Sequence, residues 1–361
     1  MAPSLFSATV PIGDYSARKG VKSALSYPEY LPTWDNEPQI YPALTPIEHR
    51  DPGLDVDSSL KDLLPEGQAE VKQITPNIGS EVRGVQLSKL TTEGKQQLAL
   101  FVAQRKVVAF RDQDLASLPI KDALQFAGSF GRHHIHAASG APKGYPEVHL
   151  VFRGEEDKSG ALTFKSRNTS VSWHSDVSFE LQPPGTTFLL FLDGPTTGGD
   201  TLFVNQVAAY QRLSPALRER LHGLTAVHSG VEQAQASLSR GGVCRREPIQ
   251  TAHPIVRTHP VTGEKALYVN KQFTRYIPEL KTEESESLLG FLFNHIAISQ
   301  DIQCRVGYEK GTVVVWDNRV TAHSGLYDFP DGQLRHLARL TPQAERPYET
   351  LFDSAAEVST S

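Results

Sequence analysis

The sequence predicts a mainly β protein: a double-stranded β-helix (jelly-roll) core with flanking helices. Two observations predict this fold class. The second half of the chain holds several short runs rich in β-branched and aromatic residues, separated by turns that contain Gly, Pro or Asn. Few of these runs alternate with helical patterns, which favours antiparallel strands in a double sheet over a parallel α/β sheet.

The first part of the chain predicts an arm followed by the start of the core. Residues 1–70 are rich in Pro, Tyr, Asp and Ser with little periodicity, so we expect an irregular arm that lies on the body or is partly disordered. A short strand and a glycine turn follow within residues 74–90. Thr91 then begins a helix that leads to residues 106–112, whose β-branched side chains suit a buried strand.

The remaining elements follow from the same patterns. The expected strands are residues 186–194, 199–205, 265–270 and 311–318, and the expected helices are residues 214–224 and 282–296. The last of these opens with an acidic turn, which favours a helix N-terminus. We therefore expect one domain over residues 71–350 and a C-terminal tail over residues 351–361.

Composition excludes several classes of protein. The 361-residue chain has a formal net charge of −5, which gives no electrostatic basis for binding nucleic acid or an anionic membrane. It has no apolar run of membrane-spanning length, and its first residues do not resemble a secretory signal. Its two cysteines, Cys244 and Cys304, have no CxxC spacing. The simplest interpretation is a cytoplasmic protein in a reducing compartment.

A candidate metal site begins at the stretch WHSDV, residues 173–177. On a strand, His174 and Asp176 would point to the same face. One imidazole and one carboxylate leave a divalent ion underligated, so a third ligand must come from elsewhere. His323, in WDNRVTAHSG, follows an apolar β run and can return to the same end of a barrel. Two histidines and one carboxylate form the facial arrangement that leaves positions open on iron(II).

Each of these residues also has an ordinary structural interpretation. The H-x-D pair could be two polar residues on a surface strand, and His323 could be a hydrogen-bonded turn histidine. Trp173 and Phe179 are large apolar neighbours that do not suit a bare solvent face.

Two arginines follow His323 in the stretch GQLRHLARL. Two-residue alternation gives Arg335, Leu337 and Arg339 one common strand face. An arginine has little reason to face inward unless it pairs with a carboxylate, so a basic inner face suits anionic ligands. The alternative is a pair of solvated arginines at the end of a strand.

These motifs resemble the TauD/TfdA family of iron(II)- and 2-oxoglutarate-dependent dioxygenases. The resemblance rests on WHSDVSF, GGDTLF, WDNRVTAH and the R-x-x-x-R strand, and it covers residues 74–349. The segments PPGTTFLLF, GGDTLFVNQVAAY, VHSGVEQA, RTHPVTGEKAL and TPQAERP are most similar to the fungal alkylsulfonate (taurine-type) branch.

The resemblance implies how iron and the co-substrate are held. His174, Asp176 and His323 would bind Fe(II). Thr201 and Arg335 would bind 2-oxoglutarate, with Arg335 on its distal carboxylate. A carboxylate suits arginine because the guanidinium supplies two parallel hydrogen bonds. No catalytic residue beyond the metal ligands is implied.

It also implies a site for a small anionic substrate. Arg339 would hold the acidic group with help from His136, and Phe179 and Phe273 would line the apolar part of the pocket. Hydroxylation of the carbon next to a sulfonate gives an adduct that falls apart to an aldehyde and sulfite.

Two positions depart from the bacterial taurine enzymes. Those enzymes carry Tyr three residues after the substrate His and Asn four residues before the first iron ligand. Here the positions are Ser139 and Ser170, so contacts to the substrate differ. A carboxylate or amino-acid substrate therefore stays open beside a sulfonate. With a carboxylate or amino-acid substrate, the same cofactors could support hydroxylation, desaturation or cyclisation.

Two rival functions use the same residues. A non-catalytic jelly-roll binding protein could retain the metal site, and a zinc hydrolase could use two His and one Asp. The hydrolase would have no use for Arg335, and no HExxH helix occurs. The expected partners are the small anionic substrate, 2-oxoglutarate and O2, with no nucleic acid or membrane, and the resemblance favours a homo-oligomer.

Overall fold

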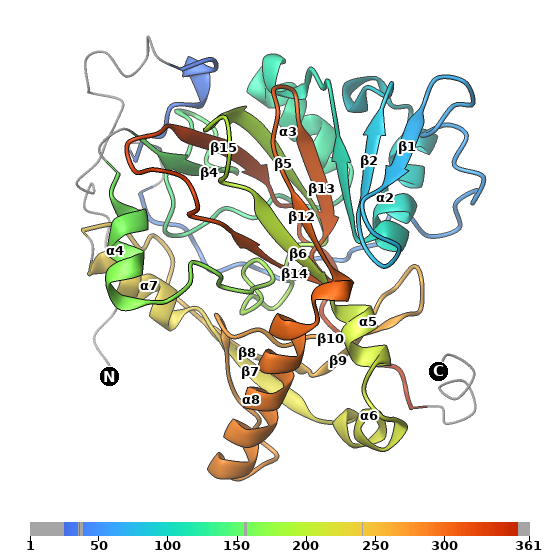
Figure 1. Cartoon of the computed structure of the whole chain (residues 1–361), viewed down its shortest axis with the longest axis vertical. Coiled ribbons are helices and arrows are strands. Elements are labelled where there is room, and N and C mark those ends of the chain that lie inside the picture. Colours follow the sequence, from blue (N-terminus) through green and yellow to red (C-terminus); the bar gives the residue numbers. More distant parts are fainter. Residues whose placement is uncertain (1–24, 35, 37–38, 155–156, 240, 353–361) are drawn as a thin grey trace.

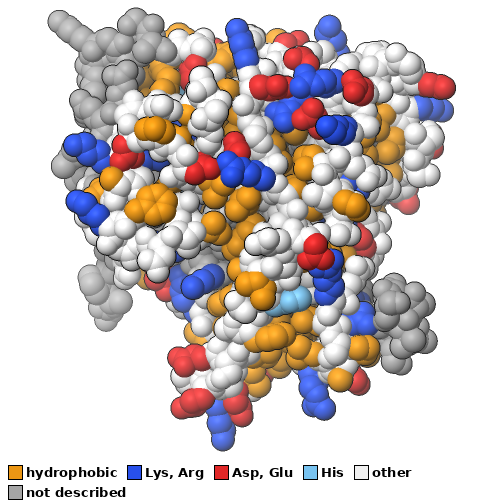
Figure 2. All heavy atoms as spheres, viewed as in Figure 1, with side chains coloured by type: hydrophobic (Ala, Val, Ile, Leu, Met, Phe, Trp, Pro, Cys, Tyr) orange, Lys and Arg blue, Asp and Glu red, His pale blue; other side chains and the backbone are white. Residues whose placement is uncertain are grey.

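A computed structural model describes residues 25–34, 36, 39–154, 157–239 and 241–352. Figure 1 shows most of the strands in the upper part of the molecule, whereas α8 (Thr282–Ile298) extends from its lower end beside several shorter strands. No helix in the described part of the chain has the length and apolar composition needed to cross a bilayer. Figure 2 shows acidic and basic side chains interspersed on one face of the molecule.

The strands form one large mixed sheet and three smaller antiparallel sheets. The large sheet has the order β1 (Glu70–Gln73), β2 (Ser80–Arg83), β3 (Val107–Phe110), β13 (Val313–Asp317), β5 (Thr186–Asp193), β15 (Arg335–Leu340) and β4 (Val148–Arg153). Only the pair β2–β3 is parallel among the strand pairs described. The smaller sheets are β12 (Gln303–Val306), β6 (Thr201–Asn205) and β14 (Thr321–Gly325); β11 (Thr274–Tyr276), β7 (Thr225–Ser229) and β8 (Gln250–Pro254); and β10 (Lys265–Leu267) with β9 (Val256–Thr258).

Helices flank these sheets. The α-helices are α2 (Thr92–Arg105), α3 (Ile120–Gly128), α4 (Ser159–Ser166), α5 (Gln206–Gln211), α6 (Pro215–Leu221), α7 (Val231–Leu238) and α8 (Thr282–Ile298). Short 3-10 turns are η2 (Pro28–Tyr30), η3 (Leu87–Lys89), η4 (Leu115–Ser117) and η5 (Gln300–Ile302). The expected cap at Thr91 is present, because its side chain accepts a hydrogen bond from the Gly94 amide.

The central strands β3 and β13 of the large sheet are buried on both faces, which explains their continuous apolar runs. Alternate side chains of β3 point to opposite faces. Val108 and Phe110 pack in a cluster with residues of α2 and α3. Val107 and Ala109 pack in a second cluster with Phe203 of β6. The second cluster therefore fills the space between the large sheet and the β12–β6–β14 sheet.

The mainly β, jelly-roll-type prediction is confirmed, with two differences of detail. The two facing sheets are separate in the described chain, so the site lies at the end of an open sandwich and not in the mouth of a closed barrel. The strand expected at residues 265–270 ends at Leu267. The Asn270 side chain accepts a hydrogen bond from the Phe273 amide and so begins a turn.

Residues 25–69 run along this body without a strand or α-helix in their described part. They are tied to it by hydrogen bonds, such as those between Ile47 and the Gln182 side chain. The part of the expected arm over residues 1–24, and residues 353–361 of the expected tail, lie outside the described residues.

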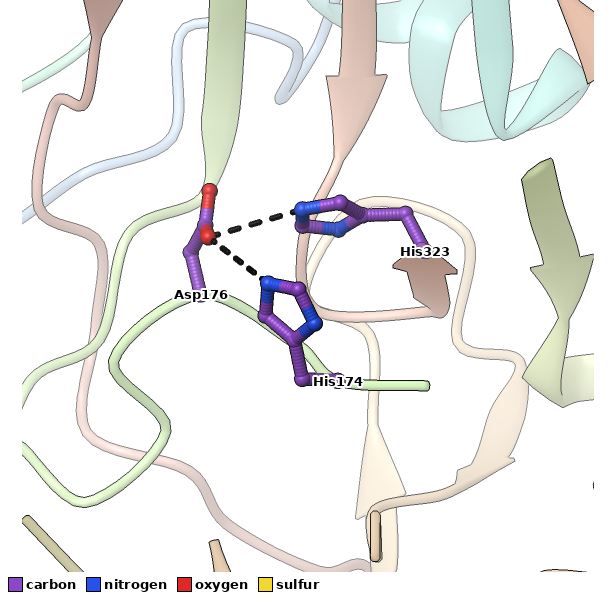
Figure 3. Close-up of side chains that lie close together, drawn as sticks. All are labelled: His174, Asp176 and His323. Carbon is purple, nitrogen blue, oxygen red and sulfur yellow. Dashed lines mark ion pairs between the residues drawn. The ribbon is translucent and has the colours of Figure 1, made fainter. Parts of the chain in front are cut away.

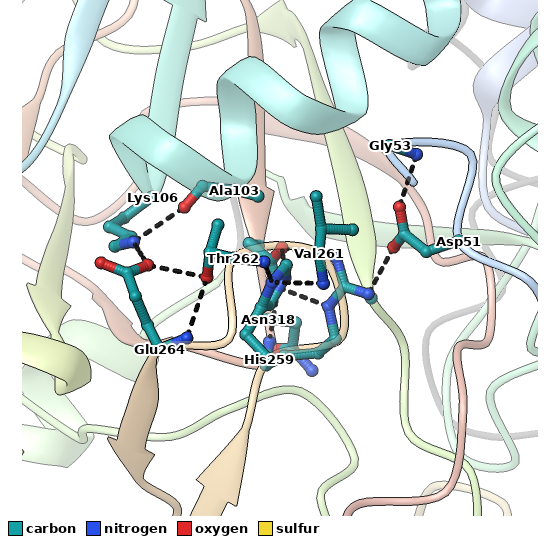
Figure 4. Close-up of polar contacts among 12 residues, drawn as sticks. Asp51, Gly53, Ala103, Lys106, His259, Val261, Thr262, Glu264 and Asn318 are labelled. Carbon is teal, nitrogen blue, oxygen red and sulfur yellow. Dashed lines mark hydrogen bonds and ion pairs between the residues drawn. The ribbon is translucent and has the colours of Figure 1, made fainter. Parts of the chain in front are cut away.

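A buried ion network fixes the loop that follows β13. Asp317 accepts hydrogen bonds from Arg319 at 2.6 and 2.8 Å and pairs with His259 at 2.9 Å. Arg319 also pairs with Asp51, and Figure 4 draws this neighbourhood. Burial alone would raise the pKa of Asp317, but Arg319 and His259 hold that pKa well below its usual range. The loop that leads into β14 is therefore held by charge as well as by packing.

Candidate metal centre and its pocket

Three side chains converge at one end of the sandwich. The Asp176 Oδ1 atom lies 3.6 Å from the His174 Nε2 atom and 3.5 Å from the His323 Nε2 atom. The ligand atoms of all three residues lie within 4.8 Å of one another. Figure 3 shows His174 and Asp176 on one loop and His323 entering from the neighbouring strand. The three predicted ligands thus meet although about 150 residues separate His323 from the other two.

The backbone brings the two histidines together. His174 and His323 form an isolated antiparallel bridge, with reciprocal hydrogen bonds of 3.0 and 2.8 Å. His323 lies on β14, which the adjacent strand β6 holds in register. A bridge of this kind places the two imidazoles side by side, and their ring centroids are 4.3 Å apart.

Asp176 is placed differently from the sequence expectation, and the strand expected through the H-x-D pair is wrong. The chain turns at Asp176, and the next residue, Val177, has φ +39°, a conformation that β-branched residues rarely adopt. Asn318 maintains this turn. Its side chain accepts a hydrogen bond from the Asp176 amide at 2.7 Å and donates to the Asp176 carbonyl at 3.1 Å. The carboxylate is therefore aimed by an amide clamp and not by strand alternation.

The donor set fits a divalent metal ion. The His174 Nδ1 atom lies 2.9 Å from the Ser172 carbonyl, which must accept its proton, so the Nε2 lone pair is free for a metal. The Asp176 Oδ2 atom and both ring nitrogens of His323 are buried without a hydrogen-bond partner in the described structure. Buried polar atoms of this kind are costly unless a ligand satisfies them.

The protonation states also fit. Burial lowers the pKa of His323 to about 4, despite the opposing effect of Asp176. Burial would raise the pKa of Asp176, but Arg339 and His323 hold it well below its usual range. At neutral pH the site therefore presents a neutral His323 imidazole and an Asp176 carboxylate, which are the forms that bind iron(II).

Arg339 lies directly beside this centre. Its Nη1 atom donates to the Asp176 Oδ1 atom at 2.6 Å, and its guanidinium carbon lies 5.5 Å from the centroid of the Trp316 ring. The Nε atom of Arg339 is buried without a partner in the described structure. The arginine predicted to clamp the substrate thus contacts a metal ligand and retains an unused donor.

Arg335, at the start of β15, and Thr201, at the start of β6, both lie close to Tyr308. Arg335 is buried, and its Nε atom donates to the Gly199 carbonyl at 3.0 Å. The Thr201 hydroxyl lies 2.6 Å from the hydroxyl of Tyr308, and the Tyr308 ring lies 6.0 Å from the Arg335 guanidinium. Sequence reasoning did not single out Tyr308, because no local pattern marks a tyrosine that reaches a distant strand.

A cavity of about 190 Å³ opens beside the metal centre. It is lined by His134, His136, His149, His174, Asp176, Val177, Gln233, Phe273, Arg339 and Thr341. Phe179 lines a neighbouring pocket and packs on Phe273 with ring centroids 5.2 Å apart. The cavity therefore combines one apolar aromatic wall with a group of nitrogen donors.

The two serines at the positions that depart from the bacterial enzymes lie elsewhere. Neither Ser139 nor Ser170 lines this cavity among the described residues. The Ser170 hydroxyl instead accepts a hydrogen bond from the Tyr327 amide at 3.3 Å. The structure thus separates these two positions from His136, Arg339 and Phe273, which it brings together.

His149 is a lining residue that sequence reasoning missed. It lies on β4 directly opposite Arg339 of β15, and its ring centroid is 4.4 Å from that of His136. Period-two alternation along β4 puts His149, Val151 and Arg153 on one face, so a local signal existed. That Arg339 is its cross-strand partner could not be predicted, because the sequence does not give the register of β4 against β15.

The comparisons with known proteins agree with this site. Residues 70–341 match the model of the family described as taurine catabolism dioxygenase TauD, TfdA family. An alpha-ketoglutarate-dependent sulfonate dioxygenase of Saccharomyces cerevisiae is 44% identical over 344 residues, covering 94% of this chain and 83% of that protein. An alpha-ketoglutarate-dependent sulfate ester dioxygenase of Pseudomonas putida is 31% identical, covering 78% of this chain and 91% of that protein.

Solved structures show the same architecture. The crystal structure of a putative alpha-ketoglutarate-dependent taurine dioxygenase from Burkholderia xenovorans superposes with a TM-score of 0.64 at 31% identity, covering 77% of this chain and 94% of that chain. Neither a zinc hydrolase nor a non-catalytic binding protein accounts for these matches together with the metal-site geometry. The chain belongs to the TauD/TfdA family of iron(II)- and 2-oxoglutarate-dependent dioxygenases.

Proposed function

We propose that this dioxygenase oxidises a C–H bond of a small alkylsulfonate, at the carbon next to sulfur. The product would decompose to an aldehyde and sulfite, with succinate and CO2 as co-products. The observation that carries the proposal is the position of Arg339 and His136 on one cavity beside the candidate iron ligands. A relative from Saccharomyces cerevisiae named as a sulfonate dioxygenase, and one from Schizosaccharomyces pombe named as a putative sulfonate dioxygenase, add support.

Separate groups of residues would bind the iron, the 2-oxoglutarate and the anionic substrate. His174, Asp176 and His323 would hold iron(II), and Arg335 with Thr201 would hold the distal carboxylate of 2-oxoglutarate. When bound, iron with 2-oxoglutarate and O2 supplies the oxidation of an unactivated C–H bond. The protein orients the substrate and excludes water. A buried guanidinium is suited to each anion because it remains charged and donates from a rigid fork.

The substrate would lie with its anionic head at Arg339 and its alkyl chain against Phe273. The Phe273 ring centroid is 6.1 Å from that of His174, so a chain packed on Phe273 runs past the metal ligands. Phe179 would support this wall from behind. Ser139 and Ser170 lie away from the cavity lining, so their departure from the bacterial pattern does not favour a carboxylate substrate.

Turnover of a matched set of compounds tests the proposal. Pentanesulfonate, hexanoate and pentanol would be compared with iron(II) and 2-oxoglutarate, following succinate, sulfite and O2 uptake. Pentanesulfonate should give the most succinate and should release sulfite, while pentanol should give almost none. Equal turnover of pentanol would contradict the role of Arg339, and a preference for hexanoate would point to the carboxylate alternative. The Asp176→Ala variant, which lacks a metal ligand, is the inactive control.

We also propose the larger context of this activity. Residues 71–350 would form the catalytic domain, and the enzyme would work in the cytoplasm, where its two buried free cysteines stay reduced. Copies of the chain would associate as a homo-oligomer through apolar surface such as Phe291 and Ile298 of α8, which are 49% and 64% exposed. Light scattering after size-exclusion chromatography tests the oligomer, and a single monomer mass would contradict it.

A further inference from the structure

His149 lines the cavity beside the candidate metal centre and has no assigned role. His149 of β4 is the direct cross-strand partner of Arg339 on β15. Directly opposed residues on one sheet face have Cβ atoms about 5 Å apart, so the two side chains reach the same volume. His149 is half-buried, and neither of its ring nitrogens has a hydrogen-bond partner in the described part of the chain. Its polar atoms are therefore available to a ligand in the cavity.

The neighbouring imidazole has a defined tautomer. The Nδ1 atom of His136 accepts a hydrogen bond from the Ala138 amide at 3.1 Å, so Nδ1 carries no proton in the neutral ring. Burial lowers the pKa of His136 to about 3, and the ring is neutral at physiological pH. The Nε2 atom is then the proton donor. The His149 ring meets this ring edge to face, at an interplanar angle of 79°.

We propose that His149 is a specificity-determining residue that donates a hydrogen bond to one oxygen of a sulfonate head group. This inference rests on the proposed function and refines it. Arg339, His136 and His149 then supply three N–H donor groups to one anionic group. A sulfonate has three terminal oxygens in a tetrahedral arrangement, whereas a carboxylate has two in a plane. A carboxylate accepts hydrogen bonds mainly near its own plane, so three donors that approach from three separate chain segments favour a sulfonate over a carboxylate.

The charge balance of the cavity agrees with this arrangement. The guanidinium of Arg339 already pairs with Asp176, and a further fixed positive charge would compete for that carboxylate. Burial, with His136 and Arg339 nearby, lowers the pKa of His149 well below its usual range. His149 thus adds a hydrogen-bond donor without adding charge. A donor left without an acceptor in a buried site is costly, which penalises a ligand that directs no oxygen toward His149.

Substitution of His149 tests the inference through a ratio of two substrates. Values of kcat/KM for pentanesulfonate and for hexanoate would be measured for the full-length enzyme with iron(II) and 2-oxoglutarate. His149→Phe keeps an aromatic ring and removes the donor, and His149→Gln keeps a donor. The Phe variant should lose roughly tenfold or more in kcat/KM for the sulfonate and less than about threefold for the carboxylate. The Gln variant should retain most of the wild-type ratio.

Two controls separate a specificity role from a structural one. The KM for 2-oxoglutarate and the thermal unfolding midpoint should be unchanged in each variant used. If the larger phenyl ring of His149→Phe destabilises the fold, that variant is replaced by His149→Leu. Leucine also removes the donor and is less bulky. Equal losses for both substrates, or an unchanged ratio in the Phe or Leu variant, would overturn the inference. If the wild-type enzyme itself turns over hexanoate and no sulfonate, the proposed function fails instead.

Discussion

At the scale of single residues, the site uses two arginines that face the same side of β15 and have different surroundings. Arg335 lies near the hydroxyls of Thr201 and Tyr308, and Arg339 contacts Asp176. The first environment offers neutral donors that can share a carboxylate with the guanidinium. The second connects the cavity to a candidate metal ligand. The two arginines are therefore not interchangeable.

Separate kinetic effects are expected from these arginines. Arg335→Ala should raise the KM for 2-oxoglutarate by tenfold or more, because a buried carboxylate loses a paired charge worth roughly 2–5 kcal/mol. Arg335→Lys should restore only part of the affinity, since the fork of two hydrogen bonds is lost. Arg339→Ala should instead raise the KM for pentanesulfonate. Steady-state kinetics with varied 2-oxoglutarate and with varied pentanesulfonate would measure both KM changes. If the two variants exchange these effects, the assigned roles are wrong although the family is not.

At the scale of elements, the loop after β13 positions the candidate metal ligands. Its Asn318 side chain holds both backbone polar groups of Asp176 and also donates to the Pro184 carbonyl at 3.2 Å. The same loop leads into β14, which carries His323. One loop, anchored by Asp317 and Arg319, therefore fixes ligands from two separate segments of the chain.

Removal of this clamp should weaken metal binding. Asn318→Ala leaves the amide and carbonyl of Asp176 without partners, and Val177 can then relax from its positive φ. Loss of such a supporting contact typically costs about 10- to 100-fold in metal affinity or activity. Calorimetric titration with Mn(II) would measure the affinity directly. Asn294→Ala, at an exposed position on α8, is the matched control and should bind as the wild type does. Unchanged affinity in Asn318→Ala would show that Asp176 holds its position without the clamp.

At the scale of the whole molecule, the packed interior contains histidines that must stay neutral. Burial lowers the pKa of His336 to about 4, and burial together with Arg257 lowers that of His253 to about 3. Each places its Nε2 atom near a backbone carbonyl, Tyr30 for His336 and Glu180 for His253. Both residues join segments distant in sequence, so their protonation opposes the assembled fold.

Stability should therefore fall in mild acid. The unfolded chain takes up protons on these histidines below a pH of about 6.5, whereas the folded chain does not until pH 4 or lower. Because the unfolded state binds more protons in this window, the free energy of unfolding decreases as the pH falls, by at most about 1.4 kcal/mol per pH unit for each histidine. Guanidinium denaturation between pH 7.5 and 4.5 would measure this slope. His336→Gln should make it shallower, and an equal slope in that variant would contradict the assignment.

The sequence by itself determined the features that depend on local spacing. The helix start at Thr91 and the common face of Arg335 and Arg339 follow from capping and from two-residue alternation. The candidate iron ligands were proposed from the family resemblance, because an H-x-D pair and a later histidine are weak evidence by themselves. The structure brings these three side chains together. The first two features require no knowledge of which strands are neighbours.

Only the tertiary structure decided the features that depend on strand register and on loop contacts. It placed Asp176 in a turn held by Asn318, paired His149 with Arg339, and brought Tyr308 to Thr201. In each case the partners are more than 100 residues apart. A one-residue change of register would turn every side chain of a strand to the other face, and a single sequence does not state which register its strands adopt. The walls of the site were therefore decided by long-range pairing, whereas motifs in the sequence already indicated its candidate metal ligands.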